Sequence, residues 1–375
     1  MLDNLTFAPR LPLKCARILL ALLVISPSQG FSIQSAEKVS PPMMTQRRPI
    51  ACWRDYLLRQ EAEGYSGAVL IAQGDKILLS KEYGFADKDG KTTAFWIASI
   101  SKTITATAVL KLVEDGRLNL HAPLSKYLPG VPTELANVTV HYLLSHRSGL
   151  PHAYAADGIV DRAAATKAIL LLKLRRKPGE FGYSNDGYSL LAALIETVSG
   201  ETFENYVRRQ VFKPAGMEGA GFWGFEPEET PVASLLNPAP GSIGPTIWLK
   251  GRSVANWGYR GASGIYATPK DLFRFARGLE SGRLLKKKTL GDMIASKEPS
   301  FEPDADTYGY GWQLRFKNGR LTQYWHSGNE DWLGHNGMLR VIGDRTYIVL
   351  SNAGRHKERS WAGYVEAGLH TCETN

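Results

Sequence analysis

Strand-like segments lie towards both ends of this chain, and helix-like segments lie between them. Near the start, two apolar runs at 67–72 and 76–80 flank Gln73-Gly74-Asp75 and predict a β-hairpin. Further strand-like segments follow one another between residues 309 and 351. Pairing the early hairpin with the late strands gives one antiparallel sheet, and the middle of the chain then forms a helical lobe. We therefore expect an α+β fold (an α/β sandwich) in which terminal helices flank the sheet.

The middle segment has helical spacing and clear helix boundaries. Residues 97–114 predict a helix that ends at Gly116, and Thr268-Pro269 predicts an N-cap followed by proline at the first helical position. We assign the sheet lobe to about 51–93 and 260–375, the helical lobe to about 94–259, and the active site to a cleft between the lobes. Other expected helices are 53–62, 140–144, 162–174, 187–198, 203–212 and 358–369; expected late strands are 309–316, 322–326, 337–341 and 345–351; residues 216–258 predict a long loop.

The first 30 residues have the pattern of a secretory signal peptide. Basic residues precede an apolar run at 18–25, and small residues follow it. The run is shorter than the roughly 20 residues needed to span a bilayer, and an uncleaved N-terminal anchor is the alternative. Cys15 precedes the run, which argues against a lipid-modified cysteine. We expect 1–30 to be a signal peptide, 31–50 a flexible lead-in and 51–375 the folded domain, exported to the periplasm or secreted.

Export changes the interpretation of the cysteines. Loss of the leader removes Cys15 and leaves Cys52 and Cys372, one near each end of the mature chain. An even number of cysteines in an oxidising compartment is typical of a disulfide. A disulfide between the two and a pair of free thiols are the alternatives.

The composition excludes several classes of function. The formal net charge is +9, but no basic–aromatic motif typical of nucleic-acid binding accompanies it, so the basic runs at 175–177 and 286–288 predict solvated surface. A basic surface favours anionic cell-wall polymers only weakly. No metal-binding spacing or glycine-rich phosphate loop occurs, so no metal or cofactor is expected. The clustered histidines His121, His141, His146 and His152 are interpreted as loop and helix residues.

One pair of residues predicts nucleophilic chemistry. Ser99 and Lys102 lie three residues apart at the start of the predicted helix 97–114, on the same helical face. A serine becomes a nucleophile near neutral pH when a base lies next to it, and a lysine can be that base if it is partly desolvated. A helix N-terminus with a solvated lysine is the alternative.

Two further motifs supply the other groups that such a pair needs. Tyr183-Ser184-Asn185 lies on a tight loop before a predicted helix and offers a phenol for proton transfer. His326-Ser327-Gly328 ends a predicted strand and is followed by Asn329, where a substrate could lie alongside the strand. Taken singly, these motifs are better explained by an Asn N-cap beside a packing tyrosine and by a histidine at a strand end before a turn.

Together and in this order, the three motifs resemble the serine β-lactamase and penicillin-binding protein superfamily, in its class C-like branch. That branch includes DD-peptidases, class C β-lactamases, esterases and D-amino-acid peptidases. The resemblance covers roughly residues 60–370. Supporting segments are 95–98, 112–118, 143–150, 179–217 and 261–279.

The resemblance implies an acyl-enzyme mechanism with defined residue roles. Ser99 would be the nucleophile, Lys102 its activating partner and Tyr183 the general base and acid. It implies an exported serine hydrolase acting on a small molecule or short peptide, such as a β-lactam or a D-amino-acid peptide. The alternative is a non-turnover penicillin- or peptidoglycan-peptide-binding protein acylated at the same serine. On the substrate side, Asn185 would bind an amide, His326 would contact a carboxylate or orient the tyrosine, Gly328 would belong to the third motif, and the backbone N–H groups of Ser99 and Asn329 would form the oxyanion hole.

His326 departs from the family pattern. The family often has lysine at this place, so the histidine removes a permanent positive charge. Members with this variant lean towards esterases and peptidases rather than efficient β-lactamases. The sequence leaves the substrate open for this reason.

Overall fold

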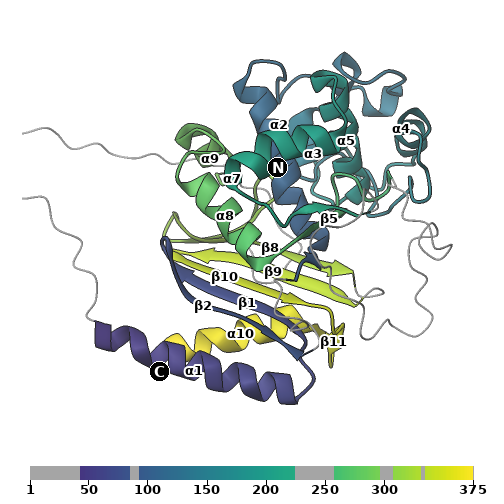
Figure 1. Cartoon of the computed structure of the whole chain (residues 1–375). Helices are drawn as coiled ribbons and strands as arrows, with labels where there is room; N and C mark the ends of the chain where they lie inside the picture. Colours follow the sequence, from purple (N-terminus) through teal and green to yellow (C-terminus); the bar gives the residue numbers. More distant parts are fainter. Residues whose placement is uncertain (1–42, 85–92, 224–256, 296–306, 331–333, 375) are drawn as a thin grey trace, which may run out of the picture. The chain divides into compact units, whose positions relative to one another are not determined.

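A seven-stranded antiparallel sheet forms the centre of the fold. The computed structural model describes residues 43–374 apart from 85–92, 224–256, 296–306 and 331–333. The strand order is β2-β1-β10-β9-β8-β7-β6 (Figure 1). The strands are β1 (Gly67–Gln73), β2 (Lys76–Tyr83), β6 (Thr307–Tyr308), β7 (Gln313–Lys317), β8 (Arg320–Glu330), β9 (His335–Ile342) and β10 (Arg345–Ser351).

Strand β1 joins the two ends of the chain. It pairs with β2 through the predicted hairpin and with β10 on its other edge, where Val69 faces Val349. The hairpin turn contains Gly74, whose φ of +53° is a conformation that glycine adopts readily. Nearly every β1 residue is buried, because helices cover both faces of the sheet at this point. This position explains why the sequence of β1 is a continuous apolar run rather than an alternating one.

Two terminal helices, α1 and α10, pack side by side on one face of the sheet (Figure 1). Trp53 and Leu57 of α1 share a buried cluster with Val349 of β10 and Val365 of α10. The Trp53 indole N–H donates to the Leu369 carbonyl at 3.1 Å. Helix α8 packs against β1 and β10 from the opposite face. The bounds are α1 (Met43–Ala62), α8 (Pro269–Glu280) and α10 (Trp361–Thr374).

The middle of the chain is helical. Helix α2 is buried along almost its whole length, which explains why its apolar residues follow no single stripe. The elements are η2 (Ala98–Ile100), α2 (Ser101–Glu114), η3 (Leu124–Lys126), η4 (Thr133–Leu135), α3 (Val140–Leu144), α4 (Arg162–Leu170), α5 (Asn185–Ser199), α6 (Phe203–Val207), the π-turn η5 (Arg208–Phe212), α7 (Lys213–Ala215) and α9 (Lys287–Met293). Small sheets pair β3 (Phe95–Trp96), β5 (Ile265–Ala267) and β4 (Gly221–Phe222), and β11 (Arg355–His356) with β12 (Arg359–Ser360).

The predicted fold class is confirmed, with differences in where elements begin and end. Helix α1 begins at Met43, inside the expected lead-in 31–50, because Met, Gln and Arg favour helix. The helix expected at 97–114 is divided, since Ala98 has a positive φ and α2 starts only at Ser101. Strand β8 continues to Glu330 rather than ending at 326, because its backbone pairs with β9 over that stretch.

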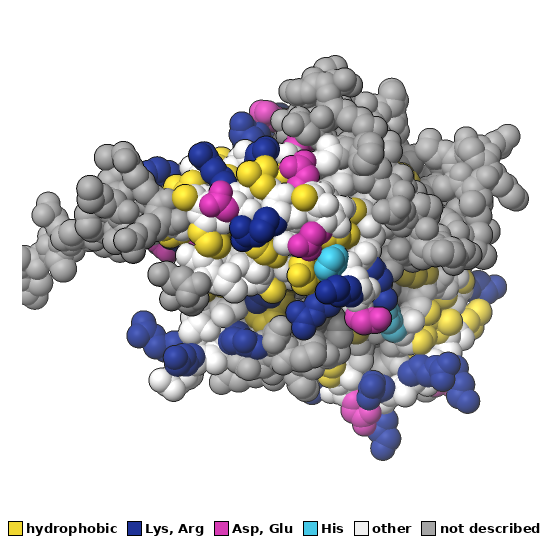
Figure 2. All heavy atoms as spheres, turned by 90° about the horizontal axis from the view of Figure 1, so that it is seen from below, with side chains coloured by type: hydrophobic (Ala, Val, Ile, Leu, Met, Phe, Trp, Pro, Cys, Tyr) yellow, Lys and Arg dark blue, Asp and Glu magenta, His cyan; other side chains and the backbone are white. Residues whose placement is uncertain are grey.

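The predicted signal peptide and most of the predicted loop 216–258 lie outside the described residues. Among the described helices, none combines the length and apolarity needed to cross a membrane. The basic runs at 175–177 and 286–288 are exposed, as predicted. Figure 2 shows Lys and Arg side chains interspersed with Asp and Glu on the face that carries α1.

Candidate active site

The turn that carries Ser99 is held by the short strand β5. The Ile97 N–H donates to the Ile265 carbonyl at 3.0 Å, and the Ile265 N–H donates to the Ser101 hydroxyl at 3.3 Å. Ala98 has a φ of +47°, an uncommon conformation for a residue with a side chain. The turn leaves Ser99 partly exposed and buries Ser101 completely, so only Ser99 is accessible to a substrate.

The amine of Lys102 has three hydrogen-bond partners. It donates to the Ser99 hydroxyl at 3.0 Å, to the Asn185 side-chain oxygen at 2.8 Å and to the Ala262 carbonyl at 2.9 Å. The side chain is 0% exposed. Burial lowers its pKa from 10.5 to about 7, and the nearby carboxylate of Glu330 partly opposes that shift. Near neutral pH, Lys102 can therefore accept a proton from Ser99.

Helix α5 brings the second motif to the same amine. Ser184 is its N-cap, accepting the Gly187 N–H at 3.1 Å through its side chain. The residue after the cap, Asn185, turns its amide oxygen towards Lys102, and the preceding Tyr183 has its ring centroid 4.8 Å from the lysine nitrogen. Ser184 rather than Asn185 is therefore the cap, which leaves Asn185 available to the site.

Strand β8 passes close to the Ser99 turn at Gly328. A Cβ added there would lie 2.2 Å from the Ile97 carbonyl oxygen, so only glycine allows this approach. The pairing of β8 with β7 ends at Trp325, whereas its pairing with β9 continues to Glu330. Asn329 is exposed beside this approach. The third motif thus lies beside the nucleophile through its backbone.

The His326 ring lies deeper than expected from the sequence. It is 1% exposed, Nδ1 lies 2.6 Å from the Ser327 carbonyl, and Nε2 lies 3.0 Å from the Tyr308 hydroxyl. A carbonyl only accepts, so Nδ1 carries the proton and Nε2 accepts from Tyr308. Burial, with Lys102 nearby, lowers the pKa of His326 from 6.5 to about 3. The imidazole is neutral, and its ring centroid lies 6.4 Å from that of Tyr183.

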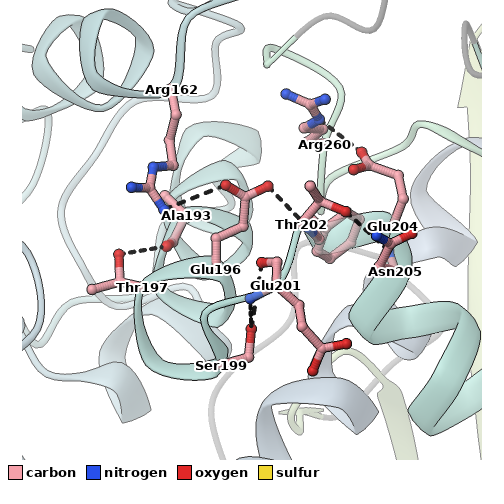
Figure 3. Close-up of polar contacts among 11 residues, drawn as sticks. Arg162, Ala193, Glu196, Thr197, Ser199, Glu201, Thr202, Glu204, Asn205 and Arg260 are labelled. Atoms are coloured by element: carbon pink, nitrogen blue, oxygen red, sulfur yellow. Dashed lines mark hydrogen bonds and ion pairs between the residues drawn. The ribbon is translucent and has the colours of Figure 1, made fainter.

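The loop at 261–262 lies in a supporting segment of the family resemblance, but the sequence did not predict that it supplies the third partner of Lys102. Gly261 has a φ of +75°, and a Cβ there would lie 2.3 Å from the Tyr188 carbonyl oxygen, so the loop packs directly on α5. The Thr105 hydroxyl of α2 donates to the Gly261 carbonyl at 2.8 Å. One residue earlier, Arg260 pairs with Glu204 of α6 at 2.7 Å (Figure 3). These contacts position a backbone carbonyl, which has no sequence signature of its own.

A buried acid near the amine was also missed. Glu330 is 3% exposed and accepts a hydrogen bond from the Tyr154 hydroxyl at 2.9 Å. It follows the third motif directly, but its role depends on β8 continuing past the predicted strand end. Within the described ranges, no group of three or more His, Cys, Asp or Glu residues could hold a metal ion.

Comparison with known proteins agrees with this geometry. The family model described as "Beta-lactamase" matches residues 55–367, which include all three motifs. The chain belongs to the β-lactamase family. The serine β-lactamases and penicillin-binding proteins share its fold, and the resemblance stated from the sequence is confirmed.

Individual relatives of this β-lactamase-family chain are distant. PbpX of Bacillus subtilis is 33% identical over 67% of this chain and 62% of PbpX, so the chain spans less than two thirds of that relative's length. The crystal structure of a penicillin-binding protein from Bacillus halodurans has a TM-score of 0.68 and 26% identity, covering 86% of this chain and 98% of that one. D-amino acid amidase from Ochrobactrum anthropi SV3, complexed with D-phenylalanine, has a TM-score of 0.69 at 23% identity, covering 87% and 99%.

Proposed function

We propose that this protein is an exported serine hydrolase that cleaves an amide or ester through an acyl-enzyme at Ser99. The observation that carries the proposal is the buried amine of Lys102, 3.0 Å from the Ser99 hydroxyl and with a pKa of about 7. Packing alone would not require the amine of a buried lysine to form a hydrogen bond with a partly exposed serine hydroxyl. Proton transfer from Ser99 to Lys102 makes the serine a nucleophile.

The reaction then follows in two halves. The Ser99 oxygen attacks the substrate carbonyl carbon, and its proton passes to the Lys102 amine. Tyr183, whose ring contacts the lysine nitrogen, transfers a proton to the leaving amine or alcohol as the scissile bond breaks. Water then attacks the acyl carbon and gives up a proton to Tyr183. Lys102 returns its proton to the Ser99 oxygen as the acyl–oxygen bond breaks, and the acid and free Ser99 are released.

The neutral His326 favours substrates without a free carboxylate at this position. Both ring nitrogens already have partners, and the neutral ring itself offers no positive charge to attract a carboxylate. We therefore expect amides and esters without a free carboxylate to be turned over faster than peptides with a free C-terminus. D-amino acid amides belong in the substrate panel because one structural neighbour carries that activity in its name.

Export is part of the proposal. The first 30 residues have signal-peptide composition, and Cys52 is bonded to Cys372 in the folded domain. Disulfides persist in the periplasm and outside the cell, whereas the cytosol keeps thiols reduced. Cell fractionation of the full-length chain, with detection of the mature N-terminus, tests this part.

Intact-mass spectrometry tests the proposed activity. The protein is mixed with a penicillin and, separately, with a fluorophosphonate serine probe. A transient penicillin adduct supports turnover, whereas a lasting one favours the non-turnover binding protein. Absence of any adduct with both reagents would overturn acylation chemistry altogether. Nitrocefin, D-Ala-D-Ala peptides, D-amino acid amides and short acyl esters then define the substrate class.

A pair of serine variants identifies the nucleophile. Ser99→Ala should abolish the phosphonate adduct without unfolding the protein. Ser101→Ala should keep the adduct and lower stability by about 1–2 kcal/mol, because the Ile265 N–H loses its acceptor. The reverse result would move the nucleophile two residues along the chain.

A further inference from the structure

His146 is a buried residue that the proposed mechanism does not use. It follows helix α3, and its side chain is 0% exposed. Its φ of +57° lies in the left-handed region, which costs about 1–2 kcal/mol for a residue with a side chain. Such a conformation persists where surrounding contacts fix it. The hydrogen bonds of its carbonyl and its ring both lead to the loop carrying Tyr183.

His146 binds the backbone on both sides of Tyr183. Its carbonyl accepts the Gly182 N–H at 2.7 Å, and its ring nitrogen Nδ1 accepts the Ser184 N–H at 3.1 Å. Ser184 is fixed in turn, since its hydroxyl donates to the Pro151 carbonyl at 2.8 Å. One residue therefore holds the backbone N–H groups of the two residues on either side of Tyr183.

The His146 ring also packs on the phenol itself. The ring centroids of His146 and Tyr183 lie 4.1 Å apart with an angle of 35° between the planes. Tyr188 and Tyr308 contact the same imidazole at 5.0 Å and 4.8 Å. The imidazole thus links the aromatic residues of α5 and β6 to the ring that contacts Lys102.

The hydrogen bonds define the form of the ring. Because Nδ1 accepts from Ser184, the proton lies on Nε2, which has no hydrogen-bond partner among the described residues. Burial holds the pKa of His146 well below its usual range, and Lys102, His326 and His152 add to that effect. Protonation would place a second N–H against the Ser184 donor.

We propose that His146 is a positioning residue, which in its neutral, Nε2-protonated form holds the Tyr183 ring against the Ser99–Lys102 pair. The inference rests on the proposed function, because Tyr183 needs a fixed position only if it transfers a proton. A misplacement of about 1 Å can cost roughly 100-fold in rate. His146 would set the acylation rate without touching the substrate.

Two substitutions separate the parts of this role. His146→Asn suits the left-handed backbone and keeps an oxygen acceptor for the Ser184 N–H, but it removes the ring. His146→Phe keeps a ring and removes the acceptor. His141→Phe is the matched control, because His141 lies on α3 and bonds the Tyr310 hydroxyl at 2.7 Å, away from Tyr183.

The fluorophosphonate reaction gives a binding constant and a maximal labelling rate for each variant, measured well below its melting temperature. We expect about 10- to 100-fold slower maximal labelling for His146→Phe, a smaller loss for His146→Asn and under twofold for His141→Phe. The binding constant should stay within about twofold for all three. If only the binding constant changes, His146 only fills space. The same holds if the labelling rate falls in proportion to the fraction of unfolded protein.

A second measurement does not depend on activity. Amide hydrogen exchange at Gly182 and Ser184 should be slow in the wild type and much faster at Ser184 in His146→Phe, while His146→Asn retains protection. The ¹⁵N spectrum of the imidazole should show an unprotonated Nδ1 from pH 5 to 8. A protonated Nδ1, or unchanged exchange in His146→Phe, would overturn the positioning role even if the wild type forms no phosphonate adduct. No adduct alone would count against the proposed function.

Discussion

At the scale of single residues, the environment of one amine determines the chemistry. Lys102 would have a pKa of 10.5 in water and would be protonated at neutral pH. Complete burial destabilises its charged form, while three oxygen partners keep the amine in place. Lys111, on the same helix, is only partly buried and pairs with Glu114 at 3.6 Å. Two lysines nine residues apart on one helix therefore have different environments.

The acylation rate should depend on pH through Lys102. Because burial lowers the pKa to about 7, the neutral amine predominates above that pH, and acylation should rise tenfold per pH unit below 7 and level off above it. Stopped-flow or quenched labelling with the phosphonate probe between pH 5 and 9 measures the profile. Lys102→Met should slow labelling by about 10²–10⁴-fold above pH 7 and should remove this pH dependence.

Lys111→Met is the control for that series. It removes a lysine from the same helix without contacting Ser99, so its profile should match the wild type. A wild-type rate that still rises tenfold per pH unit between pH 7 and 9 would mean that Lys102 stays protonated, and it would refute the assignment of Lys102 as base.

At the scale of elements, the site depends on how closely β8 approaches the turn before α2. Gly328 lies where any side chain would meet the Ile97 carbonyl, 2.2 Å from an added Cβ, and the Cβ of Ala98, at 3.2 Å. The hydrogen bonds of β5 keep that turn from moving away. Sheet and helical segment are therefore held at a fixed separation beside Ser99.

Gly328→Ala should separate β8 from the turn. We expect a loss of stability of about 1–3 kcal/mol and a fall in acylation rate of about 100-fold, because the added methyl group displaces backbone beside the nucleophile. Urea denaturation and phosphonate labelling measure the two effects. Gly291→Ala in α9 is the control, since nothing lies within 4 Å of its added Cβ and alanine favours helix. Equal behaviour of the two variants would contradict the close-approach argument.

At the scale of the whole domain, the disulfide joins the two terminal helices. Cys52 of α1 and Cys372 of α10 are bonded across 320 residues of sequence, so of the two alternatives left open by the sequence, the structure has the disulfide. Both helices cover the sheet face opposite α8, away from the Ser99 turn.

Reduction should therefore lower stability more than activity. We expect dithiothreitol to lower the free energy of unfolding by about 2–4 kcal/mol, because the reduced unfolded chain gains conformational freedom. The phosphonate labelling rate of folded protein should stay the same. The double variant Cys52→Ala, Cys372→Ala should already have the lower stability and should not respond to dithiothreitol. If dithiothreitol still lowered the stability of that variant, the loss of stability would have a cause other than this disulfide.

Acid should destabilise the domain through its buried histidines. Burial lowers the pKa of His326 to about 3 and of His335 to about 4, from 6.5. The unfolded chain therefore binds protons below pH 6.5 that the folded chain does not bind, so the free energy of unfolding falls as the pH drops. At pH 5 each of these histidines accounts for a loss of about 2 kcal/mol. Asp186, whose pKa burial raises to about 6, opposes this below pH 6 to a smaller extent.

Urea midpoints at pH 7.5 and 5 test this dependence. The midpoint should be lower at pH 5, and His335→Met should reduce the difference by removing one of the contributing histidines. An equal or higher midpoint at pH 5 would show that these histidines take up protons within the folded domain.

Much of the fold could be predicted from the sequence, because its signals are local. Alternating and continuous apolar runs predicted the bounds of β1, β2 and β10 to within a few residues. Thr268-Pro269 predicted the start of α8, because Thr268 is its N-cap. The three motifs likewise consist of short segments, so Ser99, Lys102, Tyr183 and Asn185 could be selected as candidates without knowing how they meet. Element ends were less certain, since β8 extends to Glu330 only because β9 pairs with it.

The sequence by itself determined which residue types are present for acyl transfer and the order of elements that carry them. Only the tertiary structure decided their properties. Burial lowers the pKa of Lys102 to about 7 and the pKa of His326 to about 3, and burial depends on neighbours that are distant in the sequence. The Ala262 carbonyl and the two backbone contacts of His146 depend on loop positions rather than side-chain identity. A sequence lists groups, whereas their pKa and orientation come from what the fold places around them.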